Sequence, residues 1–160
     1  MAGDIKGKYG TSAGITITLA SLASGSARQS DAIDLSSSTP RDILAMIAPK
    51  LGSGTLSGQK AVNVYVSGSI DGGTTYGGGL TGSDGSYSMG SPTVLQLWAV
   101  IPYSASGTAM PCEPCGVAWA FRNALPPKVA FVVENQTGIA FSATEGDHVK
   151  TYLPVLGQYT

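Results

Sequence analysis

Short stretches in which aliphatic and polar residues alternate run along most of this chain. Strict alternation is the pattern of a half-buried β-strand. The clearest strand predictions are residues 15–20 (ITITLA), 62–68 (VNVYVSG), 94–101 (VLQLWAVI) and 116–121 (GVAWAF). The last of these would place Trp119 and Phe121 on one face. Residues 27–35 are expected to return beside the first stretch as a hairpin, with Ile33 and Leu35 facing inward.

The C-terminal part of the chain predicts three further strands joined by two turns. Residues 129–133 (VAFVV) are apolar on both faces, so this strand is expected to be covered on both sides. A turn at 135–138 (NQTG) leads to a short strand at 139–143 and then to a longer strand from Val149. Pro154 in the last strand indicates a sheet edge or a bulge, because proline cannot donate a ladder hydrogen bond.

Residues 41–51 (RDILAMIAPKL) fit two kinds of element. Ile43, Leu44 and Ile47 would share one face of a helix. Pro49 would be unfavourable in a helix interior, and the neighbouring elements are all predicted strands. A strand is therefore the favoured prediction, with the helix as the alternative.

The two remaining regions lack periodicity. Residues 1–14 predict an arm that is disordered or ordered only against a partner. Residues 72–91 are so rich in glycine that we expect a long functional or mobile loop rather than a packed segment. The pattern as a whole predicts an all-β fold, an antiparallel β-sandwich that is jelly-roll-like, in which residues 15–160 form a single domain behind a flexible N-terminal arm.

Composition narrows the classes of function. Charged residues make up 12% of the chain and the net charge is −1, against about 25% charged residues in an average domain. No basic face or stripe is present for nucleic acid. No apolar run approaches the roughly 18 residues of a membrane span, and the N-terminus has no signal-peptide core. We therefore expect no nucleic-acid partner, no membrane partner and synthesis in a cytoplasm.

Cys112 and Cys115 have the CxxC spacing of zinc and redox sites. A zinc site needs two more ligands, and His148 is the single histidine of the chain. A redox motif of the thioredoxin type should open a helix, whereas prolines flank Cys112. The favoured alternative is a tight turn whose thiols are buried or free, so no metal or cofactor is expected.

Residues 10–14 (GTSAG) match the nucleophile-elbow pattern G-x-S-x-G. That elbow requires a strand before the serine and a helix after it, which this position lacks. A hydrolase using Ser12 and His148 remains a third hypothesis, but Asp147 and His148 would point to opposite faces of a strand. No catalytic residues and no enzymatic activity are expected.

Three other short patterns have ordinary explanations. Asp71 and Asp84 each precede glycine, which favours turns over calcium loops because the alternating acidic ligands are missing. Asn135 begins a glycosylation sequon, which matters only in a secreted eukaryotic protein.

Tyrosines in the glycine-rich loop are expected to touch a ligand or partner, whereas Trp98 and Trp119 are expected in the core. The partner-contact candidates are Lys6, Lys8 and Tyr9 in the arm and Tyr76 and Tyr87 in the loop.

Parts of this chain resemble a group of small virion structural proteins of tailed bacteriophages. The pieces that carry the resemblance are residues 15–25 with 27–34, residues 64–76 (VYVSGSIDGGTTY), and residues 125–128 (LPPK) with 133–138 (VENQTG) and Tyr159. Residues 41–51 and the turn at 112–115 lie outside the pattern. The resemblance implies a β-sandwich or jelly-roll subunit that coats a capsid or sits in the tail, with no enzymatic activity.

The leading hypothesis is therefore a capsid decoration (cement) subunit that binds and stabilises the phage head. It would be made in the bacterial host cytoplasm and located in the virion. Its partners would be the major capsid protein and copies of itself, in a cyclic homo-oligomer such as a trimer. The alternative is a tail or baseplate structural protein that binds host glycans through the aromatic, glycine-rich loop.

Overall fold

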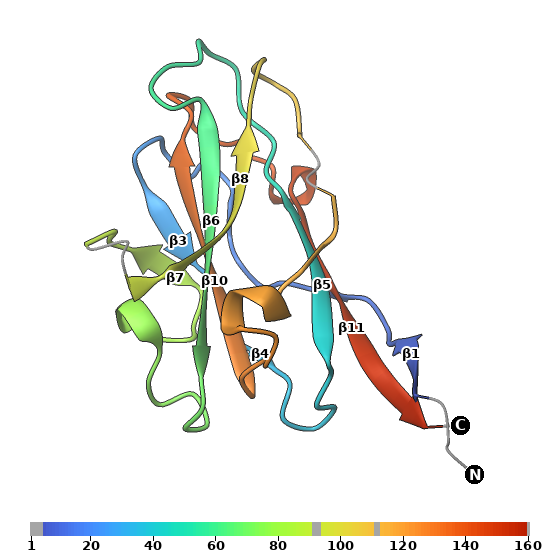
Figure 1. Ribbon diagram of the computed structural model, residues 1–160. Helices are drawn as coiled ribbons and strands as arrows, with labels where there is room; N and C mark the ends of the chain where they lie inside the picture. Colours follow the sequence, from blue (N-terminus) through green and yellow to red (C-terminus); the bar gives the residue numbers. More distant parts are fainter. Residues whose placement is uncertain (1–4, 91–93, 111–112, 160) are drawn as a thin grey trace.

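The protein is described here by a computed structural model that covers residues 5–90, 94–110 and 113–159 (Figure 1). The strands are β1 (Ile5–Tyr9), β2 (Ala13–Gly14), β3 (Ala27–Gln29), β4 (Ile33–Asp34), β5 (Asp42–Ala48), β6 (Ala61–Ser69), β7 (Gly85–Tyr87), β8 (Gln96–Pro102), β9 (Cys115–Gly116), β10 (Lys128–Gln136) and β11 (Val149–Tyr159). The 3-10 helices described between them are η1 (Gly77–Gly79), η3 (Ala118–Phe121) and η4 (Glu145–Asp147). The predicted all-β class is confirmed.

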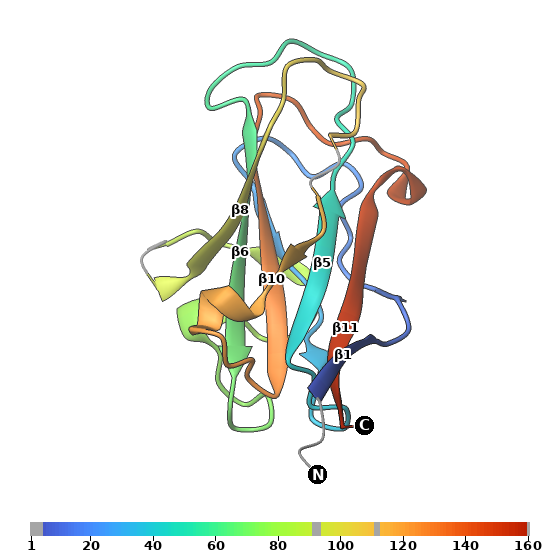
Figure 2. The same ribbon diagram turned by 45° about the vertical axis from the view of Figure 1, so that its right-hand side comes forward.

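Two antiparallel sheets face each other as a β-sandwich (Figure 2). The first sheet has the order β1-β11-β5-β9, with β2 also on β11. The second has the order β7-β3-β10-β6-β8, with β4 also on β10. The sandwich is therefore confirmed, while the finer jelly-roll description stays a prediction.

The central strand of the second sheet is β10. It pairs with β6 over its whole length, from Lys128 opposite Ser69 to Gln136 opposite Ala61. Every residue from 129 to 133 is 0% exposed. The sequence prediction that this strand is covered on both faces is confirmed, because both the opposite sheet and a long loop pack on it.

The main core lies between the two sheets. Strand β5 directs Ile43, Ala45 and Ile47 inward, each 0% exposed, so period-two burial confirms a strand over the helix alternative. From the other sheet Trp98 packs edge-on against Phe131, with ring centroids 5.5 Å apart. The predicted core position of Trp98 is confirmed.

A second, smaller cluster covers the outer face of the second sheet. It joins Tyr65, Ala130 and Val132 of the sheet to Tyr76, Leu80 and Leu95 of the loop. The expectation that the glycine-rich loop packs no core is therefore wrong. Gly78 and Gly82 have φ of 74°, a conformation that glycine adopts at little cost, and this lets the loop fold back on the sheet.

Residues 15–20 show the predicted burial but form no ladder. Ile15, Ile17 and Leu19 are at most 3% exposed, while the threonines between them are exposed. The segment passes from the first sheet at β2 to the second at β3, so it pairs with neither as a strand. The predicted hairpin with residues 27–35 is wrong, because β3 and β4 pair with β10 instead. The inward positions of Ile33 and Leu35 are confirmed.

Two other strand predictions also fail for lack of a ladder. In residues 116–121 the chain turns into η3, because the Asp42 carboxylate accepts the backbone N–H groups of Val117 (2.9 Å) and Ala118 (2.7 Å). Trp119 is consequently 50% exposed, contrary to its predicted core position. Residues 139–143 cross from β10 in one sheet to β11 in the other, with one isolated bridge from Phe141 to Leu51.

Pro154 lies inside β11, which has neighbours on both sides, so the predicted sheet edge is wrong. The alternative of a bulge fits the register, in which Tyr9 lies opposite Val155 and Ala13 opposite Tyr152. The Pro154 carbonyl accepts the Gly10 N–H at 2.8 Å. A strand residue directs its nitrogen and carbonyl to the same neighbour, so the missing N–H of Pro154 faces the N-terminal segment. That segment is interrupted there, between the end of β1 at Tyr9 and the start of β2 at Ala13.

Candidate interaction surfaces

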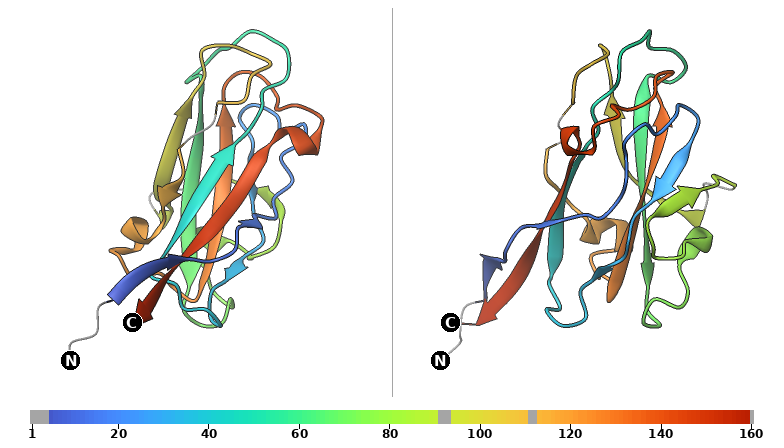
Figure 3. Two further views of the ribbon diagram at one scale, coloured as in Figure 1. Left: turned by 90° about the vertical axis from the view of Figure 1, so that its right-hand side faces the viewer. Right: turned by 180° about the vertical axis from the view of Figure 1, so that it is seen from behind.

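The N-terminal segment forms one candidate surface. Strand β1 pairs with the end of β11, from Ile5 opposite Tyr159 to Tyr9 opposite Val155. The expectation of an arm without its own structure is thus corrected for the residues from Ile5 onward. The pairing of β5 with β11 ends at Asp42 opposite Val155. Among the described strands, residues 156–159 therefore pair with β1 alone, and the two strands project past the sandwich (Figure 3).

This projecting pair, which we call the terminal ribbon (residues 5–9 and 155–159), presents polar and aromatic groups. Lys8 is exposed and Tyr9 is 66% exposed. The side chain of Lys6, also a predicted contact residue, lies outside the described side chains. A two-stranded ribbon is only marginally stable in water, and it becomes more stable when a further strand pairs with its open edge. The ribbon is therefore suited to accept a strand from another protein chain.

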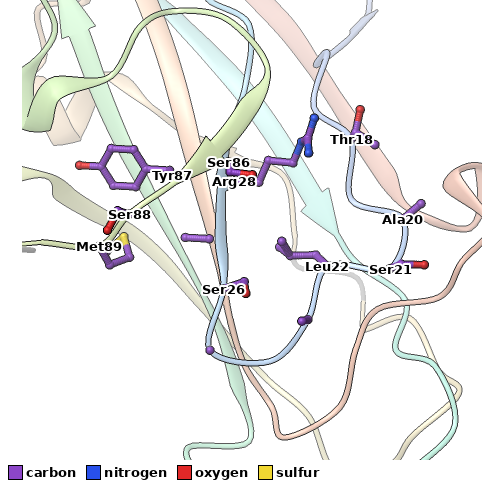
Figure 4. A pocket seen from close by; sticks show the side chains of 13 residues that line it. Thr18, Ala20, Ser21, Leu22, Ser26, Arg28, Ser86, Tyr87, Ser88 and Met89 are labelled. Atoms are coloured by element: carbon purple, nitrogen blue, oxygen red, sulfur yellow. The ribbon is translucent and has the colours of Figure 1, made fainter.

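A groove of about 680 Å³ forms the second candidate surface (Figure 4). One wall is the segment between β2 and β3 that passes from one sheet to the other, which we call the crossing segment; it contributes Thr18, Ala20, Ser21 and Leu22. The other wall is the end of β7 with residues 87–89. Hydroxyl groups from both walls line it. Its lining residues are Thr18, Ala20, Ser21, Leu22, Ala23, Gly25, Ser26, Ala27, Arg28, Ser86, Tyr87, Ser88 and Met89.

The charge in this groove is neutralised within the chain. Arg28 donates from Nε and Nη2 to the two carboxylate oxygens of Asp84, at 2.6 and 3.0 Å. Asp84 also accepts the backbone N–H of Thr18 at 3.1 Å and its hydroxyl at 2.6 Å. Burial favours the neutral acid, but the hydrogen bonds from Arg28 and Thr18 hold the pKa of Asp84 at about 2. The groove can therefore offer neutral hydrogen-bonding groups to a polar ligand.

The two loop tyrosines that were predicted as contact residues have different surroundings in the structure. Tyr76 is 5% exposed in the outer cluster, so its ring is committed to packing within the chain. Tyr87 is half-buried at the groove wall and donates its hydroxyl to the Gly78 carbonyl at 2.5 Å. The arm and loop candidates do not come together, because β1 and β7 lie at edges of different sheets (Figures 1 and 3).

A more apolar groove of about 800 Å³ lies at the other side of the outer cluster. Ile70 and Tyr76 line it from the loop after β6, and Phe121, Leu125 and Pro126 line it from the segment before β10. Neither groove is visible in the sequence pattern. Both depend on loops that are far apart along the chain.

His148 has a structural role in this fold. The backbone N–H of Lys50 donates to its Nδ1 at 3.1 Å. The proton of the neutral ring is therefore on Nε2, which lies 3.2 Å from the Ser142 carbonyl that it donates to. The register of β2, with Ala13 opposite Tyr152, places Ser12 near Leu153, which is five positions beyond His148, or about 16 Å at the rise of an extended strand. Both ring nitrogens of His148 are already hydrogen-bonded to the backbone, and Ser12 lies too far away. Ser12 and His148 therefore do not form a nucleophile and base pair.

The other sequence motifs have local structural roles. The Asp71 carboxylate accepts the Ser69 hydroxyl at 2.6 Å and the N–H of Thr75 at 2.9 Å, which lowers the pKa of Asp71 and closes a turn. Asn135 is 0% exposed and donates to the carbonyls of Leu22 and Ile139, so the sequon is inaccessible. Cys115 is exposed on β9. Its predicted companion Cys112 lies outside the described residues.

No family model, curated protein or solved structure matches this chain. Within residues 5–90, 94–110 and 113–159, no helix has the length and apolar character needed to cross a bilayer. In the same part of the chain, no three His, Cys, Asp or Glu side chains gather as a metal site would require. The terminal ribbon and the two grooves are therefore the features from which a function can be inferred.

Proposed function

We propose that this chain is a virion structural subunit of a tailed bacteriophage that decorates the capsid and stabilises the head. The terminal ribbon is the observation that carries this proposal. A β-sandwich supplies the rigid body, and the ribbon supplies open strand edges outside it. The resemblance of the strand and turn segments to phage virion proteins supports the same role.

The ribbon would act by binding rather than by catalysis. A strand of the major capsid protein would add to the open edge of the ribbon, with main-chain hydrogen bonds supplying affinity. Lys8 and Tyr9 would supply the side-chain contacts, because both are exposed on β1. The low charge of the chain suits a surface covered by neighbouring subunits, since a net charge near zero favours association.

Cryo-electron microscopy of expanded, undecorated capsids mixed with the purified protein tests this proposal. We expect additional density at regular capsid positions, and we expect it to be lost in a variant that lacks residues 1–9. The control is Ile70→Ser, because Ile70 is 87% exposed and far along the chain from the ribbon. Bare capsids with the intact protein would contradict decoration. Full binding by the truncated variant would contradict the role of the ribbon.

A second candidate function is host-glycan binding in the tail or baseplate. The hydroxyl-lined groove between residues 18–28 and 86–89 favours it, because Arg28 is already paired with Asp84 and the remaining groups suit a neutral sugar. A glycan array would show binding by the intact protein and loss in a Ser86→Tyr variant that fills the groove. Absence of binding to every glycan would remove this candidate.

A further inference from the structure

The open edges of the two sheets are protected to different degrees. An exposed strand edge pairs readily with another chain unless it is short, charged or covered. Strands β9, β4 and β7 are short, with two, two and three residues, and the five-residue β1 belongs to the terminal ribbon described above. Strand β8 has seven residues and pairs only with β6 among the described residues.

Strand β8 has exposed apolar side chains and no charged residue. Among the described residues, four of the seven exposed large hydrophobic side chains lie on or beside it: Val94 (60% exposed), Leu97 (41%), Val100 (52%) and Trp119 (50%), the last on η3, which contacts β8. No charged residue lies between Asp84 and Glu113. Exposed apolar surface of this kind usually marks a protein interface.

The backbone of β8 has a donor and an acceptor aimed outward. Tyr103 donates its N–H to the Lys60 carbonyl of the neighbouring strand at 2.8 Å. In an antiparallel pair alternate residues face the same neighbour, so Val100 directs its N–H and carbonyl away from β6. Pro102 also faces outward and has no N–H, which confines any added pairing to the residues before it.

We propose that β8 pairs antiparallel with β8 of a second copy of this chain across a twofold axis. The pairing would join the two second sheets into one continuous sheet. This inference concerns self-association alone and does not depend on the virion role. It differs from the trimer expected from the sequence.

A second copy is favoured over a different partner because the edge is self-complementary. A twofold axis places each strand against itself, so any charge on it would face its own copy. Strand β8 carries none. Leu97 and Val100 lie opposite Tyr65 and Asn63, alternate residues of β6, so both point to one face. Across the axis their side chains would meet those of the second copy and form a continuous apolar strip.

Sedimentation velocity and light scattering on the purified protein test this proposal. We expect the mass of two chains for the intact protein and of one chain for Leu97→Lys and Val100→Lys, because each lysine would place a charge in the apolar strip between the two copies. Ile70→Lys is the matched control and should retain the mass of two chains, since Ile70 is 87% exposed after the end of β6. Circular dichroism would verify that each variant is folded.

Amide hydrogen exchange measured by NMR distinguishes strand pairing from side-chain contact. We expect the outward Val100 amide to exchange slowly in the intact protein and rapidly in Leu97→Lys. The proposal is overturned by a single-chain mass for the intact protein. It is also overturned by an assembly that survives both lysine substitutions, or by equally rapid exchange of Val100 in the two proteins.

Discussion

Residues 15–20 and strand β10 contribute equally buried side chains to the core but are held in different ways. Phe131 of β10 is 0% exposed and Ile17 of the crossing segment is 2% exposed. β10 lies in a ladder with β6 on one side and with β3 and β4 on the other. The crossing segment has backbone bonds at its start, from the Ile15 N–H to the Lys150 carbonyl of β11, and from residue 17 to residue 20 its backbone bonds to charged side chains.

Two carboxylates take the place of a ladder for this segment. Glu145 Oε2 accepts the backbone N–H groups of Leu19 at 2.9 Å and Ala20 at 2.7 Å. Its Oε1 pairs with the ammonium of Lys150, which also donates to the Ile17 carbonyl at 2.7 Å. Asp84 binds Thr18 and Arg28 in the same manner. Alternating burial therefore does not require a β-ladder when side chains can satisfy the backbone.

The largest effect on stability is expected from a substitution of a buried residue in the crossing segment. This substitution tests whether the segment packs as tightly in the core as a strand does. Ile17→Ala should lower the free energy of unfolding by about 2–5 kcal/mol, because it removes a buried aliphatic side chain and leaves a cavity. Urea unfolding would measure the loss, with Thr16→Ala at the exposed neighbouring position as control. A loss for Ile17→Ala no greater than for this control would show that the segment packs weakly.

Removing the carboxylate of Glu145 should remove the hydrogen bonds that hold the crossing segment in place of a ladder. Glu145→Ala leaves two backbone N–H groups and the Lys150 ammonium without this acceptor, which should cost about 1–3 kcal/mol. Amide exchange of Leu19 and Ala20 should accelerate while the amides of β10 stay protected. Glu113→Ala, at an exposed carboxylate, is the matched control. Unchanged exchange at both positions would contradict the role assigned to Glu145.

Acid should weaken the hydrogen bonds that the Asp84 carboxylate accepts, because protonation removes its charge. The pKa of Asp84 is about 2 in the folded protein, below its ordinary value of 3.8, so its charged form stabilises the fold. That stability is complete above pH 4 and is lost as pH falls toward 2, by on the order of 2 kcal/mol. Asp84→Asn should remove this part of the pH dependence. Identical acid unfolding curves for the two proteins would contradict it.

The smallest effect concerns the start of β11, beyond the crossing segment. Burial lowers the pKa of His148 below its ordinary value of 6.5, and the protonated ring could no longer accept the Lys50 N–H. The unfolded chain therefore binds the proton more readily, and stability should decrease as pH falls below 6.5. Lys50, Asp147, Glu145 and Lys150 carry the nearby charges. NMR titration of His148 would measure the midpoint, and one at or above 6.5 would contradict the prediction.

The pattern of the sequence alone predicted the all-β class and strands β6, β8 and β10, and it favoured a strand over a helix for β5. These follow from local periodicity and from β10 being apolar on both faces. The turn at Gly138, with φ of 83°, was also predictable from its residues. The resemblance to phage virion proteins came from the same strand and turn segments.

Only the tertiary structure decided which extended segments pair and which cross between the sheets. Periodicity reports burial, whereas pairing depends on partners that are distant along the chain. Residues 15–20, 116–121 and 139–143 were predicted as strands, and each instead turns or crosses where a carboxylate or an isolated bridge replaces the ladder. The terminal ribbon likewise escaped prediction, since β1 has no periodicity and its order comes from β11 at the opposite end of the chain.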